Sequence, residues 1–310
     1  MDLKRMKVTL MSIIIGILVV SGCLYLLLSE RNQTKVETVK AVASVNQEPT
    51  ENTEGMAVQD AKTAIEVQTE QVEDSDKPIK ENIKDKVREV LEMALDFLKR
   101  DQKIVAIGDS LTEGVGDETE NGGYVGILNH TFEDNSLNIS VENFGKKGNR
   151  SDQLLKRLEK EEIASAIKEA DMVLITIGAN DIMNVLKSNF MNVTMEPFKE
   201  ERVKYIERLR AIFNKINDLN PDTQIFLIGF YNPFERHFGE IKELGMIIDN
   251  WNDDGKSLAD EYDNVRYIPT KDLFSKSNVD LLAEDEFHPN TSGYKLIAQR
   301  VLEYLKEFNE

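Results

Sequence analysis

The chain has 310 residues, 56 acidic against 38 basic side chains, a formal net charge of -18 at pH 7 and 41% hydrophobic residues. These values are typical of a globular protein of one or two domains. The acidic balance argues against nucleic acid as a partner, because little positive charge is available to neutralise phosphates. One cysteine, Cys23, excludes an internal disulfide framework and a cysteine-based zinc site.

Residues 1–28 combine a basic start with a long apolar run. Three basic side chains within the first seven residues precede a nearly uncharged stretch over residues 8–28. At about 1.5 Å of rise per residue, this stretch is long enough to cross a hydrocarbon core about 30 Å thick. Because positive residues stay on the cytoplasmic side, we expect an uncleaved anchor helix that leaves the rest of the chain outside a bacterial cell membrane.

The tetrapeptide Val-Ser-Gly-Cys at residues 20–23 gives a second interpretation. It resembles a bacterial lipobox, in which Cys23 would be lipidated and become the new N-terminus. The apolar run continues over residues 24–28, where mature lipoproteins usually turn polar, and this favours the anchor. Both interpretations stay open beside a plainly cleaved signal, and either of the first two tethers the protein to the outer face.

Residues 29–78 have a different composition, rich in Glu, Gln, Thr, Val, Asn and Lys. No aromatic residue occurs between Tyr25 and Phe97, so this stretch has little with which to build a core. It is predicted to be a disordered acidic linker. A flexible chain of about 50 residues has an end-to-end distance on the order of 40 Å, enough to hold a domain off a membrane surface.

A helical pattern begins after Pro78. Apolar residues recur at spacings of three and four between charged ones, which predicts an amphipathic helix. They are Ile79, Ile83, Val87, Val90, Leu91, Leu95 and Leu98. We expect this helix to lead a folded domain over residues 79–310.

Apolar strand-like runs then alternate with helical stretches. Strands are predicted at 103–107, 137–144, 172–177, 223–230 and 265–268, and helices at 124–132, 151–170, 197–219, 241–262 and 292–308. Regular alternation implies right-handed crossovers and a mostly parallel five-stranded sheet covered on both faces. The predicted fold class is therefore a three-layer α/β/α sandwich. Parallel strands bring the turns after their carboxyl ends to one edge of the sheet.

Ser110 follows the first of these strands directly. The apolar run Ile104–Ile107 leads into Gly108-Asp109-Ser110, which predicts a buried strand and a sharp turn. Near the end of the chain an aspartate, Asp285, precedes a histidine, His288, by three residues. A serine hydroxyl needs a neighbouring base to become a nucleophile, and His288 can supply it, with Asp285 orienting the imidazole.

Acyl transfer also requires donors for the oxyanion that forms when the carbonyl is attacked. The turns after the second and third strands contain Gly148 and Asn180. The predicted donors are the backbone N–H groups of Ser110 and Gly148 and the side-chain amide of Asn180. Gly148 also suits a close approach of the backbone to a substrate.

Four blocks of residues resemble those of the SGNH, or GDSL-type, hydrolase family, in the same order along the whole folded domain. The blocks are Gly108–Leu111, Gly148, Gly178–Asp181 and Asp285–Pro289. The resemblance implies a flavodoxin-like sheet, no metal or organic cofactor, and hydrolysis of acyl esters or thioesters. Carried over position by position, it makes Ser110 the nucleophile, Gly148 and Asn180 oxyanion donors, and Asp285 with His288 the rest of the triad.

Several other polar residues have simpler structural interpretations. Lys146, Lys147 and Arg150 surround Gly148, where many relatives carry small or neutral residues, and a solvated basic loop is the favoured interpretation. His130 and His237 lack an acidic residue at the matching spacing before a proline and are predicted to be surface or loop histidines.

The remaining candidates are apolar or acidic. The turn at residues 230–234 is expected to line an acyl pocket, because it follows the fourth strand on the active edge. Trp251 could line the same pocket, although core packing explains it equally well. Asp109 and Asp181 could tune the site, but a role as caps or turn residues is the simpler interpretation.

The primary hypothesis is thus a surface-tethered serine esterase of lipase, lysophospholipase or acylhydrolase type. Phe190, Met191 and Phe198, after the third strand, favour lipid-like acyl chains over O-acetyl groups on cell-wall or other polysaccharides. Metal-dependent hydrolysis is disfavoured, because no paired-histidine spacing such as H-E-x-x-H occurs. A non-catalytic surface binding module on the same fold is the alternative of another class, against which the complete set of triad residues argues.

Overall fold

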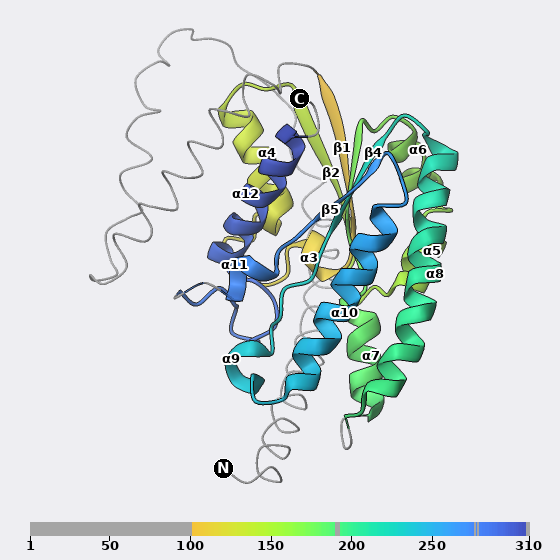
Figure 1. Cartoon of the computed structure of the whole chain (residues 1–310). Helices are drawn as coiled ribbons and strands as arrows, with labels where there is room; N and C mark the ends of the chain where they lie inside the picture. The colour runs from red at the N-terminus through yellow and green to blue at the C-terminus, as the bar shows by residue number, and fades with distance from the viewer. Residues whose placement is uncertain (1–100, 190–192, 276, 278, 308–310) are drawn as a thin grey trace, which may run out of the picture. The chain divides into compact units, whose positions relative to one another are not determined.

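The computed structural model describes residues 101–189, 193–275, 277 and 279–307, all of which belong to one compact unit, Asp85–Glu310. Five strands form a single parallel sheet in the order β2-β1-β3-β4-β5 (Figure 1). They are β1 (Gln102–Gly108), β2 (Ile139–Gly145), β3 (Met172–Thr176), β4 (Gln224–Ile228) and β5 (Val265–Ile268). This arrangement confirms the predicted parallel α/β sheet and its flavodoxin-like order.

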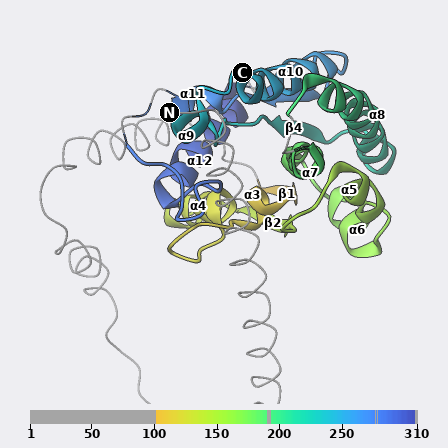
Figure 2. The same ribbon diagram turned by 90° about the horizontal axis from the view of Figure 1, so that it is seen from below.

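Alternate residues of β1 point to opposite faces of the sheet and enter two separate cores. Ile104 and Ala106 pack with residues of α4 (Gly123–Asp134) and α12 (Thr291–Glu307), which cover one face. Val105 and Ile107 pack on the other face with residues of the remaining long helices. Those helices are α5 (Ser151–Arg157), α6 (Glu161–Lys168), α7 (Ala179–Asn189), α8 (Met195–Leu219) and α10 (Lys242–Ala259). Figures 1 and 2 show the resulting three layers.

Several helices differ from the predictions. The helix predicted over 151–170 is two helices, α5 and α6, and a helix that the sequence did not indicate, α7, follows β3 at once. Helix α8 begins at Met195, two residues before the predicted start at Pro197. A proline is tolerated in a first helical turn, because the N–H that it lacks would have no partner there.

Three short helices complete the connections at the carboxyl edge of the sheet. They are α3 (Ser110–Glu113), α9 (Glu235–Phe238) and α11 (Lys271–Ser275). Figure 2 looks onto this edge from below and shows α3 and α7 near its centre, at the ends of β1 and β3. The edge therefore brings together the connections that carry the predicted site residues.

The predicted anchor or signal (1–28), the acidic linker (29–78) and the leading amphipathic helix (from 79) lie outside the described residues, which begin at Asp101. Among the helices that the structure describes, none combines the length and the apolar character that a membrane crossing requires. The domain boundary at residue 79 stays a prediction.

Candidate active site

Strand β1 ends at Gly108, and Ser110, two residues later, is the first residue of α3. Asp109 caps this short helix: its Oδ1 accepts a hydrogen bond of 3.1 Å from the Leu111 N–H. The expected sharp turn is thus a single helical turn. Because the first N–H groups of a helix have no acceptor within it, the Ser110 N–H is available to a ligand.

His288 joins Ser110 to Asp285 by two hydrogen bonds. Its Nε2 lies 2.9 Å from the Ser110 Oγ, although the two residues are 178 positions apart in the sequence. Its Nδ1 lies 2.5 Å from the Asp285 Oδ2. The structure therefore brings together the three residues that the sequence analysis selected, in the order serine, histidine, aspartate.

The loop that carries Asp285 and His288 is held by its own backbone. The second carboxylate oxygen, Asp285 Oδ1, accepts the N–H groups of Phe287 (3.0 Å) and His288 (2.9 Å). Burial opposes ionisation, but these bonds and the nearby His288 hold the pKa of Asp285 below its ordinary value. Asp285 is therefore ionised near neutral pH and can accept a hydrogen bond from the His288 Nδ1.

Gly148 and Asn180 approach this edge from two different connections. Gly148 has a φ of +76°, in the left-handed region that favours glycine, and no atom lies within 4 Å of the position a Cβ would take. The positive φ, and not a lack of space for a side chain, therefore explains why this position is a glycine. The Asn180 Nδ2 donates one hydrogen bond of 3.0 Å to the Asn149 carbonyl, which leaves its second N–H free to serve as a donor.

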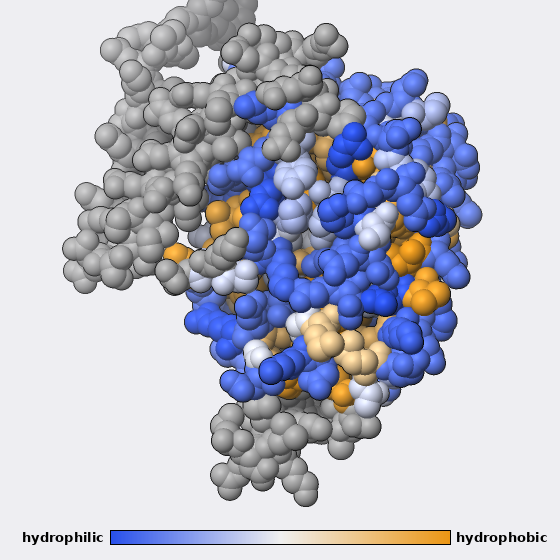
Figure 3. Space-filling view, in the orientation of Figure 1, coloured by the Kyte–Doolittle hydropathy of each residue, from blue (hydrophilic) through white to orange (hydrophobic). Residues whose placement is uncertain are grey.

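A pocket open to the surface adjoins Ser110 and His288. Its wall is mainly apolar, built by Ile182, Met183, Phe230, Tyr231, Pro233, Phe234, Ile248 and Phe287. The expectation that the turn at 230–234 lines a pocket is therefore confirmed. Figure 3 shows a mainly hydrophilic face with scattered hydrophobic residues, some of which gather over α8 and α10.

Two aromatic residues considered for this pocket lie elsewhere. Phe198 is 1% exposed and packs in the core, so the use of Phe198 as an argument for a lipid-like substrate was wrong. Trp251 is also buried in the core, where it stacks on Tyr205 with ring centroids 4.6 Å apart. Phe190 and Met191 lie outside the described residues.

Asp109 is a further buried carboxyl group at the site. It lines the pocket and accepts hydrogen bonds from Leu111 N–H and from Thr176 Oγ1 (3.0 Å). Burial raises its pKa to about 6, which these hydrogen bonds and His288 only partly oppose. The predicted capping role is confirmed. The burial that raises this pKa could not be predicted from the sequence.

The basic residues around Gly148 and the two remaining histidines lie at the surface. Lys146 and Lys147 are exposed, and Arg150 pairs with Asp152 at 3.1 Å, consistent with a solvated basic loop. His130 and His237 are also largely exposed, the latter 3.0 Å from Glu286. Within the part of the chain that the structure describes, no group of three or more His, Cys, Asp or Glu side chains is arranged to hold a metal ion.

A sequence model of the GDSL-like lipase/acylhydrolase family matches residues 106–296, from the end of β1 to the start of α12. The chain belongs to this family. The match covers most of the sheet and all the residues described above. Family membership makes the protein a hydrolase of ester bonds.

Two relatives of this GDSL-like hydrolase come from Bacillus species. YpmR of Bacillus subtilis is 38% identical over 208 residues, which cover 66% of this chain and 81% of YpmR. The spore germination lipase LipC of Bacillus licheniformis is 26% identical over 201 residues, which cover 63% of this chain and 92% of LipC. The similarity thus spans about four fifths of YpmR and nine tenths of LipC.

Solved structures share the fold. An acetyl-xylooligosaccharide esterase of Geobacillus stearothermophilus, Axe2, is 26% identical with a TM-score of 0.53, and the similarity covers 65% of this chain and 92% of that one. Structures of Axe2 include catalytic mutants in which a serine, a histidine or an aspartate is replaced by alanine. A lipase from a goat rumen metagenome, 24% identical, has a TM-score of 0.59 over 67% of this chain and 99% of its own.

Proposed function

We propose that this GDSL-like hydrolase cleaves acyl esters by a serine mechanism in which Ser110 is the nucleophile. The observation that carries the proposal is the hydrogen-bonded series from Asp285 through His288 to Ser110. His288 Nε2 takes the Ser110 proton as the Oγ attacks the acyl carbonyl, and Asp285 stabilises the imidazolium that forms. His288 then protonates the departing alcohol, and the acyl group stays on Ser110.

Water then hydrolyses the acyl-serine and regenerates the free enzyme. His288 removes a proton from water, the hydroxide attacks the acyl-serine, and the proton returns to Ser110 Oγ as the carboxylic acid leaves. In both steps the developing oxyanion accepts hydrogen bonds from the Ser110 and Gly148 N–H groups and from Asn180 Nδ2. Loss of one such donor typically lowers the rate about 10²- to 10³-fold.

The substrate that we propose is a lipid-like acyl ester or thioester. The apolar pocket beside Ser110 supports this choice, since a hydrocarbon chain attached to the attacked carbonyl could enter it. Hydrolysis of O-acetyl groups on cell-wall or other polysaccharides is the second candidate, favoured by the similarity to the acetyl-xylooligosaccharide esterase. The two candidates differ in the length of the acyl chain.

We also propose that the enzyme acts outside the cytoplasmic membrane, tethered through residues 1–28. The basic start and the apolar run of that segment support this location, and the linker predicted over 29–78 would hold the hydrolase domain away from the surface.

Hydrolysis of p-nitrophenyl esters from acetyl to long acyl chains tests the mechanism and the substrate together. The full chain is compared with its Ser110→Ala variant, and we expect the variant to lose at least 10³-fold in kcat/KM. A preference for longer chains would support the lipid-like substrate, whereas a preference for acetyl would favour the second candidate. A folded parent that cleaves no ester or thioester would instead favour a binding module.

A further inference from the structure

Two of the three oxyanion donors of the proposed mechanism come from separate segments of chain. The Gly148 N–H belongs to the connection between β2 and α5, and the Asn180 amide belongs to the first turn of α7. A displacement of about 1 Å in a reacting geometry can lower a rate 10²-fold. The spacing of these two donors therefore has to be fixed by contacts between α5 and α7.

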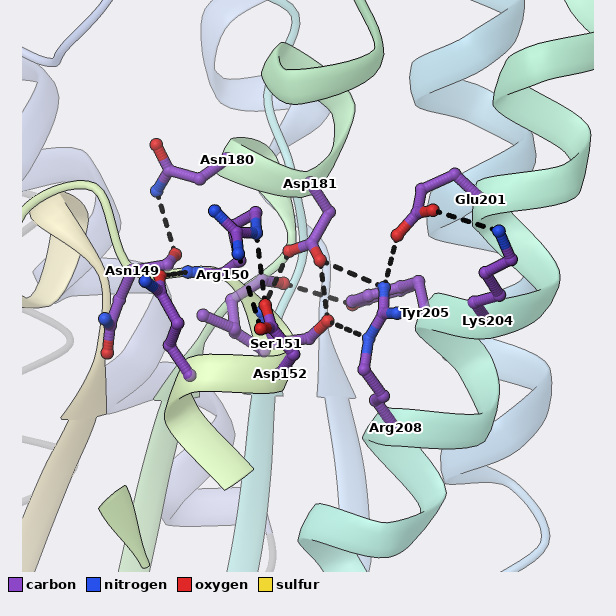
Figure 4. Close-up of polar contacts among 12 residues, drawn as sticks. Asn149, Arg150, Ser151, Asp152, Asn180, Asp181, Glu201, Lys204, Tyr205 and Arg208 are labelled. Carbon is purple, nitrogen blue, oxygen red and sulfur yellow. Dashed lines mark hydrogen bonds and ion pairs between the residues drawn. The ribbon is translucent and has the colours of Figure 1, made fainter. Parts of the chain in front are cut away.

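Asp181, the neighbour of Asn180, makes the first of these contacts (Figure 4). Its Oδ2 accepts the Ser151 N–H at 3.0 Å and its Oδ1 accepts the Ser151 Oγ–H at 2.7 Å. Ser151 is the first residue of α5 and is completely buried, and Asp181 is 1% exposed. A carboxylate on α7 thus satisfies the N-terminus of α5, three residues after Gly148.

Arg208 reaches this pair from α8. Its Nε donates to Ser151 Oγ at 2.7 Å and its Nη2 donates to Asp181 Oδ1 at 3.1 Å. The same Nη2 also donates to Glu201 Oε1 on α8 at 2.5 Å, and this second contact helps to hold the guanidinium in place. Figure 4 shows the Arg208 side chain pointing from α8 toward both partners. Burial raises the pKa of Asp181, while the Ser151 hydrogen bonds and the positive charge of Arg208 favour its ionised form.

Asn149, in the connection between β2 and α5, has contacts of its own that hold this segment. Its carbonyl accepts the Asn180 amide at 3.0 Å, and its side-chain oxygen accepts Arg157 Nη1 at 2.8 Å. Arg157 also donates to the carbonyls of Gly108 and Phe144, at the ends of β1 and β2. The segment after Gly148 is therefore attached to the sheet at Asn149 and to α7 and α8 at Ser151.

We propose that Asp181, Ser151 and Arg208 are positioning residues that hold the Gly148 N–H and the Asn180 amide at the separation that a developing oxyanion requires. None of the three lines the pocket beside Ser110. They act through the donors, so their effect falls on the rate of the chemical step and not on the binding of the ground-state ester. This inference rests on the proposed serine mechanism.

Two conservative variants test it. Ser151→Ala removes only the hydroxyl that links Asp181 to Arg208, and Arg208→Lys keeps the positive charge but loses the paired contact. We expect each to lower kcat for the best p-nitrophenyl ester 10- to 100-fold, with KM within twofold of the parent. An alkyl boronic acid, which forms a tetrahedral adduct with the serine, should bind more weakly by the same factor as kcat/KM falls.

The matched control is Arg210→Lys, two residues along α8. Arg210 is exposed and pairs with Glu261, so kcat, KM and boronate affinity should stay at the parent values. If both test variants fold, as judged by circular dichroism, and keep kcat within twofold, or if only KM changes, the positioning proposal is overturned. Should Arg208→Lys fail to fold, Ser151→Ala decides, because it removes a single oxygen atom.

The order of measurements separates this inference from the mechanism on which it rests. Ser110→Ala is compared with the parent first. If Ser110→Ala keeps the parent activity, the proposed serine mechanism fails and the positioning proposal falls with it. If Ser110→Ala is inactive and the Ser151 and Arg208 variants are unaffected, only the positioning proposal fails.

Discussion

Two carboxyl groups near Ser110 have pKa values shifted in opposite directions. Hydrogen bonds from backbone N–H groups and from His288 outweigh the burial of Asp285 and lower its pKa. Burial dominates at Asp109, which is 3% exposed, and raises its pKa to about 6. Opposite environments of this kind keep one carboxyl group ionised and allow the other to bind a proton near neutral pH. The two residues therefore contribute to stability over different ranges of pH.

Asp109 should destabilise the folded protein as the pH rises. Its pKa changes from an ordinary 3.8 to about 6 on folding, so the folded state binds more protons between these values and stability falls across that interval. At 1.36 kcal/mol per pKa unit the loss is about 3 kcal/mol above pH 6. Asp109→Asn can still accept a hydrogen bond but has no carboxyl group to titrate. We expect its free energy of unfolding in urea, relative to that of the parent, to rise by up to about this amount between pH 4 and pH 7.

Asp117 provides a control of opposite sign. Its burial is outweighed by hydrogen bonds from Thr291, Thr119 and Gly123, which lower its pKa. Asp117→Asn should therefore lose stability relative to the parent at pH 7, and the loss should shrink as the pH falls below the ordinary aspartate value. A difference between Asp109→Asn and the parent that is the same at pH 4 and pH 7 would contradict the raised pKa of Asp109.

At the scale of helices and strands, the sheet was predictable and the α7 helix was not. β1, β3 and β4 contain short apolar runs, and β2 and β5 mix apolar with polar residues, so the five strands and their common edge follow from local pattern. The residues Gly178–Asp181 favour a turn, and they do turn the chain, but α7 starts within them. The sequence predicted one helix where the structure has α5 and α6, both of which pack against α8.

The same distinction applies to the site. Ser110, Asp285 and His288 could be selected because each stands in a short, recognisable block. Arg208 could not, since it is one of many charged residues on α8 and only the packing of α8 on α5 and α7 brings it to Asp181. A residue that acts through a partner distant in sequence leaves no local pattern to detect.

Helix α7 lines the pocket in which we propose that the acyl chain binds. Ile182 and Met183 form part of the pocket wall, and Met183 is only partly buried. We expect Met183→Trp to fill the pocket and to lower kcat/KM for long-chain p-nitrophenyl esters at least tenfold relative to acetyl, since overfilled apolar sites reject extra methylene groups. Met246→Trp, at an exposed position on α10, is the matched control and should leave the chain-length profile unchanged. Equal losses for acetyl and long-chain esters in Met183→Trp would argue against an acyl pocket at this place.

At the scale of the whole molecule, the proposed tether predicts where the activity is found in a cell. Expressed in bacteria, the full chain should sediment with membranes and resist extraction by high salt, because an apolar segment and not surface charge holds it there. The fragment 79–310, which lacks the tether, should appear in the soluble fraction. Loss of labelled palmitate in Cys23→Ser would identify the lipoprotein alternative, whereas full-chain activity in the soluble fraction would contradict the tether.

The separation of 178 positions between Ser110 and His288 in the sequence has a consequence for folding. The site is assembled from segments that follow four different strands and meets only at the edge of the completed sheet. Its contacts are therefore of high contact order, and they form only after slow, non-local parallel pairing. Esterase activity is for this reason an indicator of the fully folded domain. We expect no excised helix-strand unit to retain the activity. During refolding, the activity should return only when the last strand has paired.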